Sequence, residues 1–392
     1  MRLTWRPIDV RRLSGGSVIE VESHGEHEAL RLVPTQPLER PLERSVVLYP
    51  TSSPLVLDSG ETLAPVRVAF TTLGHLNEAG DNAVLVCHAL TGSAVASGPD
   101  GWWRDVIGSG RMLDPQRDFI VSSNVLGGCA GTTGPASVNP ENGRPFGNAF
   151  PRITLADMVR VQSALLNHLG VRRLALVIGG SMGGLQVLEW LRASPEKVAA
   201  GVVVGAPARH SAWALAFNHL ARLALTGGAG NDPTTDGLRL ARAVATLSYR
   251  SPFSLDWVQG RSRSPVDPAR RGIETYLEHQ GDRLVERFDA VSYLRIIDAM
   301  DDFDLTDAAA GDIQAPVLCV GISSDQLYPP AEVRALASLL PRGEYWELSS
   351  PHGHDAFLIE ARRLERRVKA YRRALRREGA ALDGKLRQAD AA

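Results

Sequence analysis

Six short apolar runs that show no alternation of apolar and polar residues constrain the fold of this 392-residue chain more than any other feature. Strands that are buried on both faces have this pattern, because neither face meets water. Helical patterns lie between several of the runs, and strands that alternate with helices predict an α/β fold with a mostly parallel, doubly wound sheet. The runs occupy residues 84–90, 118–124, 174–180, 198–206, 316–322 and 344–350.

Two further patterns predict local structure around this sheet. Residues 45–50 and 64–74 flank the Gly-containing turn signal 57–63, and this predicts an antiparallel strand pair. Residues 154–170 have a broad apolar face at helical spacing. Thr154 and Asp157 are spaced like a capping box at the start, and Gly170 lies just past the end.

The alternation stops between residues 209 and 311, where the sequence is helical in character, rich in Ala, Leu and Arg, and without a convincing buried strand. Because sheet-like runs resume afterwards, we interpret this stretch as a helical cap inserted into one core. The predicted organisation is an unassigned segment 1–44, a core of 45–208 and 312–370, the cap 209–311 and a charged tail 371–392.

Composition and charge exclude several classes of protein. The formal net charge is −1, so nothing points to nucleic acid, and we interpret the basic stretch near the C-terminus as a solvated helix face. No run approaches 18 apolar residues, which predicts no membrane span, and the N-terminal stretch lacks the apolar core of a signal peptide. Three scattered cysteines predict neither a disulfide framework nor a metal site. We expect a cytoplasmic protein.

A serine fenced by glycines marks the candidate active site. Residues 179–183 read Gly-Gly-Ser-Met-Gly and match G-x-S-x-G, the nucleophile elbow of the α/β-hydrolase fold. A strand precedes the motif and a helix follows it, as that turn requires. Ser181 would therefore sit in a strained bend above a helix N-terminus, whose free N–H groups favour a developing negative charge.

The elbow predicts partners in the chain order serine, acid, histidine. Asp325 follows a late strand, and His352 and His354 follow the last one. A histidine there would take the serine proton, and the aspartate would fix its tautomer. For the oxyanion hole, the backbone N–H groups of Met182 and Leu90 are the candidates, since Leu90 lies in the loop after an early strand. These residues predict an acyl-serine enzyme and leave esterase and transferase open.

Several motifs together resemble the homoserine O-acetyltransferase family of α/β-hydrolase-fold enzymes. They are "DNAVLVCHALTGSA", "NVLGGCAGTTGPASVNP", "FPRITLADMVRVQSALLNHLG", "GGSMGGLQVLEW", "TLSYRSPF", "RFDAVSYL", "SSDQLYPP" and "GHDAF", and the similarity runs from about Asp58 to Glu360. The resemblance implies ping-pong transfer of an acetyl group from acetyl-CoA to L-homoserine, in methionine biosynthesis, by a homodimer paired through the cap. Acetyl-CoA is then a co-substrate, and no cofactor is expected.

The same resemblance implies roles for particular residues. His354 of "GHDAF" would be the base, Arg250 of "SYRS" would hold the substrate carboxylate, and Asp355 would meet the substrate ammonium. The family usually has Tyr where this chain has His352, so this chain carries a second histidine beside the base. The first 45 or so residues lie outside the similarity.

The acyl donor is predicted from one position. In relatives of this fold that use succinyl-CoA, the residue two after the catalytic aspartate is typically Arg, which can pair with the succinyl carboxylate. Here that residue is Leu327, which offers a carboxylate no partner but packs against an acetyl methyl group. The prediction is acetyl-CoA. The alternatives are homoserine O-succinyltransferase, a serine O-acyltransferase of the same fold, and a serine esterase.

Overall fold

A computed structural model describes residues 17–24, 27–34, 40–228 and 230–389, with side chains described for 40–228 and 230–378. Its centre is an eight-stranded sheet in the order β12-β11-β10-β9-β7-β8-β6-β3. The first six strands of that order are mutually parallel, and β6 and β3 continue the sheet in antiparallel pairing. The bounds are β12 (Gly343–Leu348), β11 (Val317–Ile322), β10 (Gly201–Val204), β9 (Leu174–Gly180), β7 (Ala83–Cys87), β8 (Phe119–Ser123), β6 (Val66–Leu73) and β3 (Leu42–Tyr49).

Successive strand residues face two different cores, because side chains alternate across a strand. Leu85 and Cys87 of β7 join the core on one face, while Val84 and Val86 join the core on the other. The first face is covered by α1 (Leu155–His168), α2 (Met182–Ala193), α8 (Asp307–Gly311) and α9 (Pro330–Leu339). The second is covered by the segment 96–113 and by α11 (Ala361–Ala389). This α/β arrangement was predicted from the buried runs.

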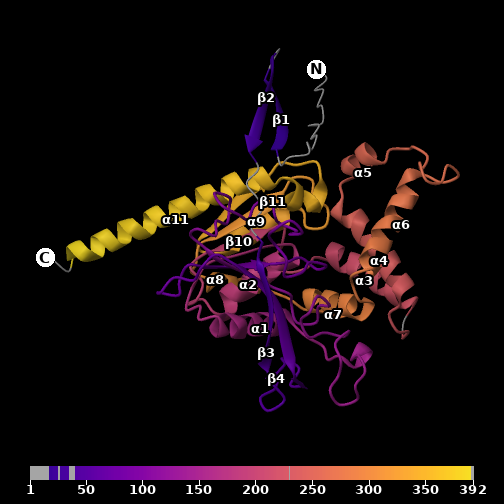
Figure 1. Ribbon diagram of the computed structural model, residues 1–392, viewed down its shortest axis with the longest axis horizontal. Helices are drawn as coiled ribbons and strands as arrows, with labels where there is room; N and C mark the ends of the chain where they lie inside the picture. The colour runs from indigo at the N-terminus through magenta and orange to yellow at the C-terminus, as the bar shows by residue number, and fades with distance from the viewer. Residues whose placement is uncertain (1–16, 25–26, 35–39, 229, 390–392) are drawn as a thin grey trace.

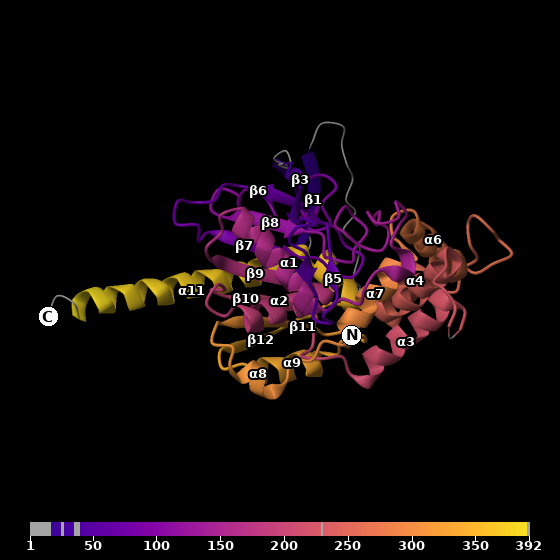
Figure 2. The same ribbon diagram turned by 90° about the horizontal axis from the view of Figure 1, so that it is seen from below.

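A group of helices is inserted between β10 and β11. They are α3 (Ala212–Thr226), α4 (Thr235–Tyr249), α5 (Pro252–Val258), α6 (Gly272–Val285) and α7 (Ala290–Asp301), with α8 completing the return to the sheet. Figure 1 shows α3 to α6 gathered on one side of the molecule, while α11 projects from the other side. Figure 2, turned by 90°, shows the same separation. Among the described residues, no helix has both the length and the apolar composition to cross a bilayer.

The remaining elements are short or peripheral. They are the hairpin β1 (Ser17–His24) with β2 (His27–Pro34), the small pair β4 (Leu55–Val56) with β5 (Thr62–Leu63), the 3-10 turns η1 (Gly147–Ala149) and η2 (Gly353–Asp355), and the short helix α10 (Ala356–Ile359). The sequence analysis left residues 1–44 unassigned, so the hairpin and the start of β3 at Leu42 were not predicted.

Two local predictions are confirmed and one is wrong. Thr154 and Asp157 form the capping box of α1, with Asp157 N–H donating to the Thr154 hydroxyl and Thr154 N–H to the Asp157 carboxylate. The strands β3 and β6 pair antiparallel around the 57–63 turn. The run 344–350 was expected to be buried on both faces, but β12 is the edge strand and most of its residues are only half-buried or exposed.

Candidate active site

Ser181 stands where the chain turns from β9 into α2. Its φ of 58° and ψ of −127° make it the only non-glycine residue with positive φ in the described part of the chain. L-residues rarely adopt this conformation, and it is the one expected of a nucleophile elbow. A Cβ at Gly179 would lie 2.4 Å from the Gly183 carbonyl oxygen, and a Cβ at Gly183 would lie 2.2 Å from that of Cys87. The glycines are therefore required by the close packing of the turn.

His354 and Asp325 form a buried pair at the carboxyl ends of the parallel strands, where Ser181 also lies. Ser181, Asp325 and His354 follow β9, β11 and β12, and the carboxyl ends of parallel strands meet at one edge. His354 Nδ1 lies 2.7 Å from Asp325 Oδ2. The other carboxylate oxygen accepts the backbone N–H groups of Leu327 and Tyr328 at 2.9 and 3.0 Å. The aspartate is thus fixed on both oxygens and orients the imidazole.

The free nitrogen of the His354 ring is available for a proton transfer. His354 Nε2 is buried and has no hydrogen-bond partner among the residues that the structure describes. The rings of Tyr249, Tyr328 and Phe357 surround the imidazole, with centroids 5.2 to 5.9 Å away. Burial acts to lower the pKa of His354, but the charge of Asp325 and its hydrogen bond outweigh burial, so the pKa is raised above its ordinary value. Such a histidine is a stronger base than one without the aspartate.

His352, the second candidate, is placed differently. Its ring is half-buried, and in the described part of the chain its Nδ1 has no hydrogen-bond partner. Its backbone N–H donates to the Ser350 hydroxyl at 3.2 Å. The carboxylate of Asp325 pairs with His354 instead. The geometry therefore favours His354 over His352 as the partner of the aspartate.

The two candidate oxyanion donors flank the serine. Met182 is the first residue of α2, a position whose N–H has no acceptor within the helix. Leu90 follows β7 and lines one pocket together with Ser181. In the part of the chain that the structure describes, neither N–H donates a backbone hydrogen bond. Both groups are thus free to receive an oxyanion.

His88 braces the loop that carries Leu90, and the sequence analysis did not single it out. Its Nδ1 bonds the Ala89 carbonyl at 2.7 Å, and its Nε2 accepts the Val125 N–H at 3.2 Å. Burial lowers the pKa of His88 to about 4, so the ring is neutral at pH 7. Gln186 of α2 donates to the His88 carbonyl at 3.1 Å. The loop and the helix below Ser181 are therefore held together.

Arg250 and Asp355 lie close to the histidine but outside the pocket that contains Ser181. Arg250 Nε and an Nη group both donate to the Ser254 hydroxyl, at 3.1 and 2.5 Å. A Cβ on Gly353 would lie 2.6 Å from the Ser251 nitrogen, so the end of α4 packs directly on the histidine loop. Burial raises the pKa of Asp355, while the nearby charges of His354, Arg242 and Arg250 act to lower it. Arg250 and Asp355, the residues expected to bind the substrate carboxylate and the substrate ammonium, are thus near neighbours.

The pocket above Ser181 is mostly apolar. Its lining includes Leu90, Ala221, Met300 and Leu327, with polar groups from Asn218, Ser248 and three tyrosines. The tyrosines are Tyr249, Tyr293 and Tyr328. Residues of the inserted helices and of the core loops both line this pocket, so the inserted helices cover one side of it. An apolar lining of this kind limits the access of water to a reactive group.

A polar network ties the cap to the loop of Asp325. The Tyr328 hydroxyl lies 2.8 Å from His210 Nε2, and His210 Nδ1 lies 2.7 Å from the Asp301 carboxylate. Asn218 and Arg222 of α3 also donate to Asp301. These bonds join residues that are 79 to 118 positions apart in the sequence. No local motif indicates them, and the sequence analysis missed them.

The sheet order, the elbow and the buried His–Asp pair define a protein of the α/β-hydrolase class with a serine at its candidate nucleophile position. A family model described as alpha/beta hydrolase fold matches residues 82–361. Among solved structures, a mutant form of esterase E22 superposes with a TM-score of 0.77 at 25% identity, over 85% of this chain and 99% of that one. A homoserine O-acetyltransferase from Bacillus anthracis has the same TM-score at 24% identity, covering 86% and 98%.

Sequence similarity narrows this class. The homoserine O-acetyltransferase of Nostoc punctiforme is 45% identical in an alignment of 331 positions that covers 80% of this chain and 92% of that protein. The chain belongs to the homoserine O-acetyltransferase family. The resemblance found in the motifs is thereby confirmed over most of the chain.

Proposed function

We propose that this protein transfers an acetyl group from acetyl-CoA to the side-chain hydroxyl of L-homoserine, in the cytoplasm, as a step of methionine biosynthesis. The observation that carries the proposal is the 45% identity to a homoserine O-acetyltransferase along 80% of the chain. The fold alone does not decide the acceptor, since an esterase superposes equally well. The apolar pocket around Ser181 supports transfer over hydrolysis.

In the first half-reaction, Ser181 Oγ attacks the thioester carbonyl while His354 Nε2 takes the hydroxyl proton. The oxyanion is held by the N–H groups of Leu90 and Met182, and Asp325 stabilises the imidazolium. The C–S bond then breaks, and the imidazolium returns the proton to the departing CoA thiolate. An acetyl-serine and free CoA result.

In the second half-reaction, the homoserine hydroxyl takes the place that the thiol has left. His354 accepts its proton, the hydroxyl oxygen attacks the acetyl-serine carbonyl, and the bond to Ser181 Oγ breaks. The proton passes to Ser181, which restores the free enzyme. Arg250 would pair with the homoserine carboxylate through its planar fork, and Asp355 would meet the ammonium.

Arg250→Ala is expected to slow the second half-reaction more than the first, because its proposed partner is the homoserine carboxylate and not CoA. Arg250→Lys should also lose activity, since a point charge does not reproduce a bidentate fork. Single-turnover acylation is compared with full turnover, and Arg283→Ala, at an exposed arginine of α6, is the control. Slow acylation with normal deacylation by homoserine would contradict the role.

The donor preference is expected to depend on Leu327, which is buried and lines the pocket beside Ser181. The kcat/KM for acetyl-CoA should greatly exceed that for succinyl-CoA, because a succinyl carboxylate would be buried there without a partner. Leu327→Arg should raise the use of succinyl-CoA relative to acetyl-CoA. Comparable kcat/KM values for the two donors in the unaltered protein would reject this assignment.

A homodimer paired through the cap is part of the proposal. Large apolar side chains are exposed on three neighbouring cap helices, and a soluble monomer rarely leaves so many in one region. They are Trp213, Leu215, Leu220, Leu223, Leu240, Leu247, Phe253, Trp257 and Val258. Light scattering at micromolar concentration should give twice the 42.3 kDa mass of the chain. A monomer under those conditions would contradict the pairing.

The function is tested by its product. Incubation with acetyl-CoA and L-homoserine should yield O-acetyl-L-homoserine and free CoA in equal amounts, as measured by mass spectrometry and thiol titration. Formation of acetate without the homoserine ester would instead identify an esterase-like hydrolase. O-acetylserine formed faster from L-serine would identify the serine O-acyltransferase alternative.

A further inference from the structure

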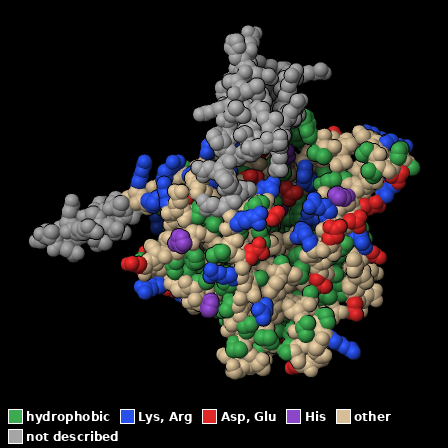
Figure 3. Space-filling view, viewed as in Figure 1, with side chains coloured by type: hydrophobic (Ala, Val, Ile, Leu, Met, Phe, Trp, Pro, Cys, Tyr) green, Lys and Arg blue, Asp and Glu red, His purple; other side chains and the backbone are tan. Residues whose placement is uncertain are grey.

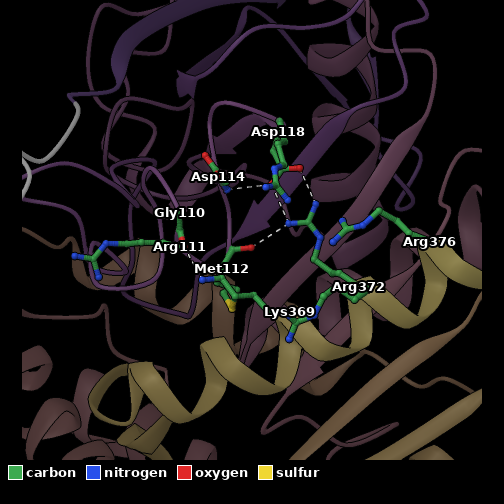
Figure 4. Close-up of a pocket in the computed structure, with 10 residues that line it drawn as sticks. Gly110, Arg111, Met112, Asp114, Asp118, Lys369, Arg372 and Arg376 are labelled. Atoms are coloured by element: carbon green, nitrogen blue, oxygen red, sulfur yellow. Dashed lines mark hydrogen bonds and ion pairs between the residues drawn. The ribbon is translucent and has the colours of Figure 1, made fainter.

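A second concave site lies between α11 and the loop before β8. Lys369, Arg372, Arg373 and Arg376 are spaced i, i+3, i+4 and i+7, so they share one face of α11. Together with residues 110–118 they line a cavity of about 220 Å³ (Figure 4). Figure 3 shows Lys and Arg side chains gathered where α11 leaves the body of the protein.

This cavity is separate from the candidate active site. Arg117 lies two residues before β8 begins, so it is at the amino end of that strand. Ser181 follows the carboxyl end of β9, and β8 and β9 both run parallel to β7. The second cavity is therefore at the amino ends of the parallel strands, and the candidate active site is at their carboxyl ends. A ligand in the second cavity would not be the group that reacts at Ser181.

Only part of the positive charge in the cavity is balanced. Arg372 makes a bidentate pair with Asp118, at 2.6 and 2.8 Å, as Figure 4 shows. Lys369 pairs with Glu365 at 2.7 Å. Four more arginines of the lining, Arg111, Arg117, Arg373 and Arg376, form no ion pair with any residue whose side chain the structure describes. Among the described residues of the lining, Asp114 is the one acid besides Asp118, against these four cations.

The unpaired arginines repel one another. Burial lowers the pKa of Arg376, and the positive charges of Arg372, Arg117 and Arg373 lower it further. An anion between these side chains would remove that repulsion. Guanidinium groups bind phosphate oxygens bidentately, so a phosphate ligand suits this cluster better than a carboxylate of lower charge.

We propose that the cavity between α11 and residues 110–118 binds a compound with two adjacent phosphate groups. Two linked phosphoryl groups carry roughly three negative charges at neutral pH, which matches the four unpaired arginines less the charge of Asp114. The cavity holds the volume of about seven water molecules, at ~30 Å³ each, and so has room for more than one phosphoryl group. A free nucleotide and a lipid headgroup share this chemistry.

The proposal is tested by titrating the full chain with pyrophosphate in a calorimeter at fixed salt. We expect saturable binding with one site per chain, weakened at least tenfold in Arg373→Glu/Arg376→Glu. Arg366→Glu/Arg377→Glu is the matched control, since both residues are exposed on the same helix, do not line the cavity and change the charge equally. The control should shift the Kd less than threefold. Arg117→Glu, on the opposite wall, should weaken binding like the first pair.

Two outcomes would overturn the proposal. One is an equal loss in both double variants, because the protein would then respond only to total charge. The other is the absence of saturable binding. Titration with nucleotide diphosphates and with vesicles that contain a phosphorylated lipid distinguishes the two sources. Whichever of them binds, its binding must be weakened selectively in the cavity variants. Acyl transfer from acetyl-CoA should stay within twofold of normal in all variants, because the cavity is at the opposite end of the parallel strands from Ser181.

Discussion

Replacing Ser181 with alanine is expected to abolish acyl transfer and to leave the fold intact. Loss of a triad nucleophile costs on the order of a million-fold in kcat. The fold should survive because alanine removes only the Oγ atom. The fold already accommodates a residue with a Cβ atom at the positive φ of this turn, and alanine has the same Cβ atom. The neighbouring glycines, which the packing requires, are unchanged.

The measurement is the release of CoA from acetyl-CoA in a single turnover, together with a thermal melt. Ser338→Ala is the matched control, because that serine is exposed on α9 and donates to the Arg334 carbonyl of the same helix. The control should acylate normally. A Ser181→Ala protein with an unchanged melt and more than a trace of CoA release would show that another group is the nucleophile.

His354→Ala is expected to be as severe as Ser181→Ala, and His352→Ala much milder. His354 Nδ1 pairs with Asp325, and its buried Nε2 has no partner among the described residues. The ring of His352 has no carboxylate partner in the same part of the chain. Each variant removes one imidazole, and the two positions are two residues apart in the same loop, so each variant is a control for the other. Equal losses in kcat/KM, or a larger loss at His352, would reverse the assignment.

The pH profile gives a second view of the same histidine. The base must be neutral to accept a proton, so kcat/KM for the donor should fall as the pH drops through the pKa of His354. That pKa is raised by Asp325, so the acid limb should lie above pH 6.5, the ordinary value. Asp325→Asn should move the limb to lower pH as well as lowering the plateau. An acid limb below pH 6 in the unaltered protein would contradict the pairing.

The fold and the order of the candidate triad were accessible from sequence because each rests on a local pattern. Buried parallel strands read as unbroken apolar runs, and the elbow needs glycines at fixed offsets from Ser181. The capping box of α1 is equally local. Asp325 and the two histidines could be placed by chain order alone, although the residues without the family resemblance did not choose between His352 and His354.

What the sequence did not reveal depends on contacts across long separations. The neutral His88 that braces the loop of Leu90 looks like any histidine until its hydrogen-bond partner 37 residues away is known. The aromatic rings of Tyr249 and Tyr328 meet around His354 from two distant segments. The exposure of β12 follows from its place at the sheet edge, which no apolar run encodes. Such features follow from topology.

The central claim, that an acetyl-serine on Ser181 is passed to homoserine and not to water, is tested most directly by changing the acceptor. Steady-state release of CoA from acetyl-CoA is measured with L-homoserine, L-serine or water as the only acceptor. The account predicts rapid turnover with homoserine, much slower turnover with serine, and with water alone a single burst of one CoA per active site. Sustained turnover with water at the rate seen with homoserine would contradict it.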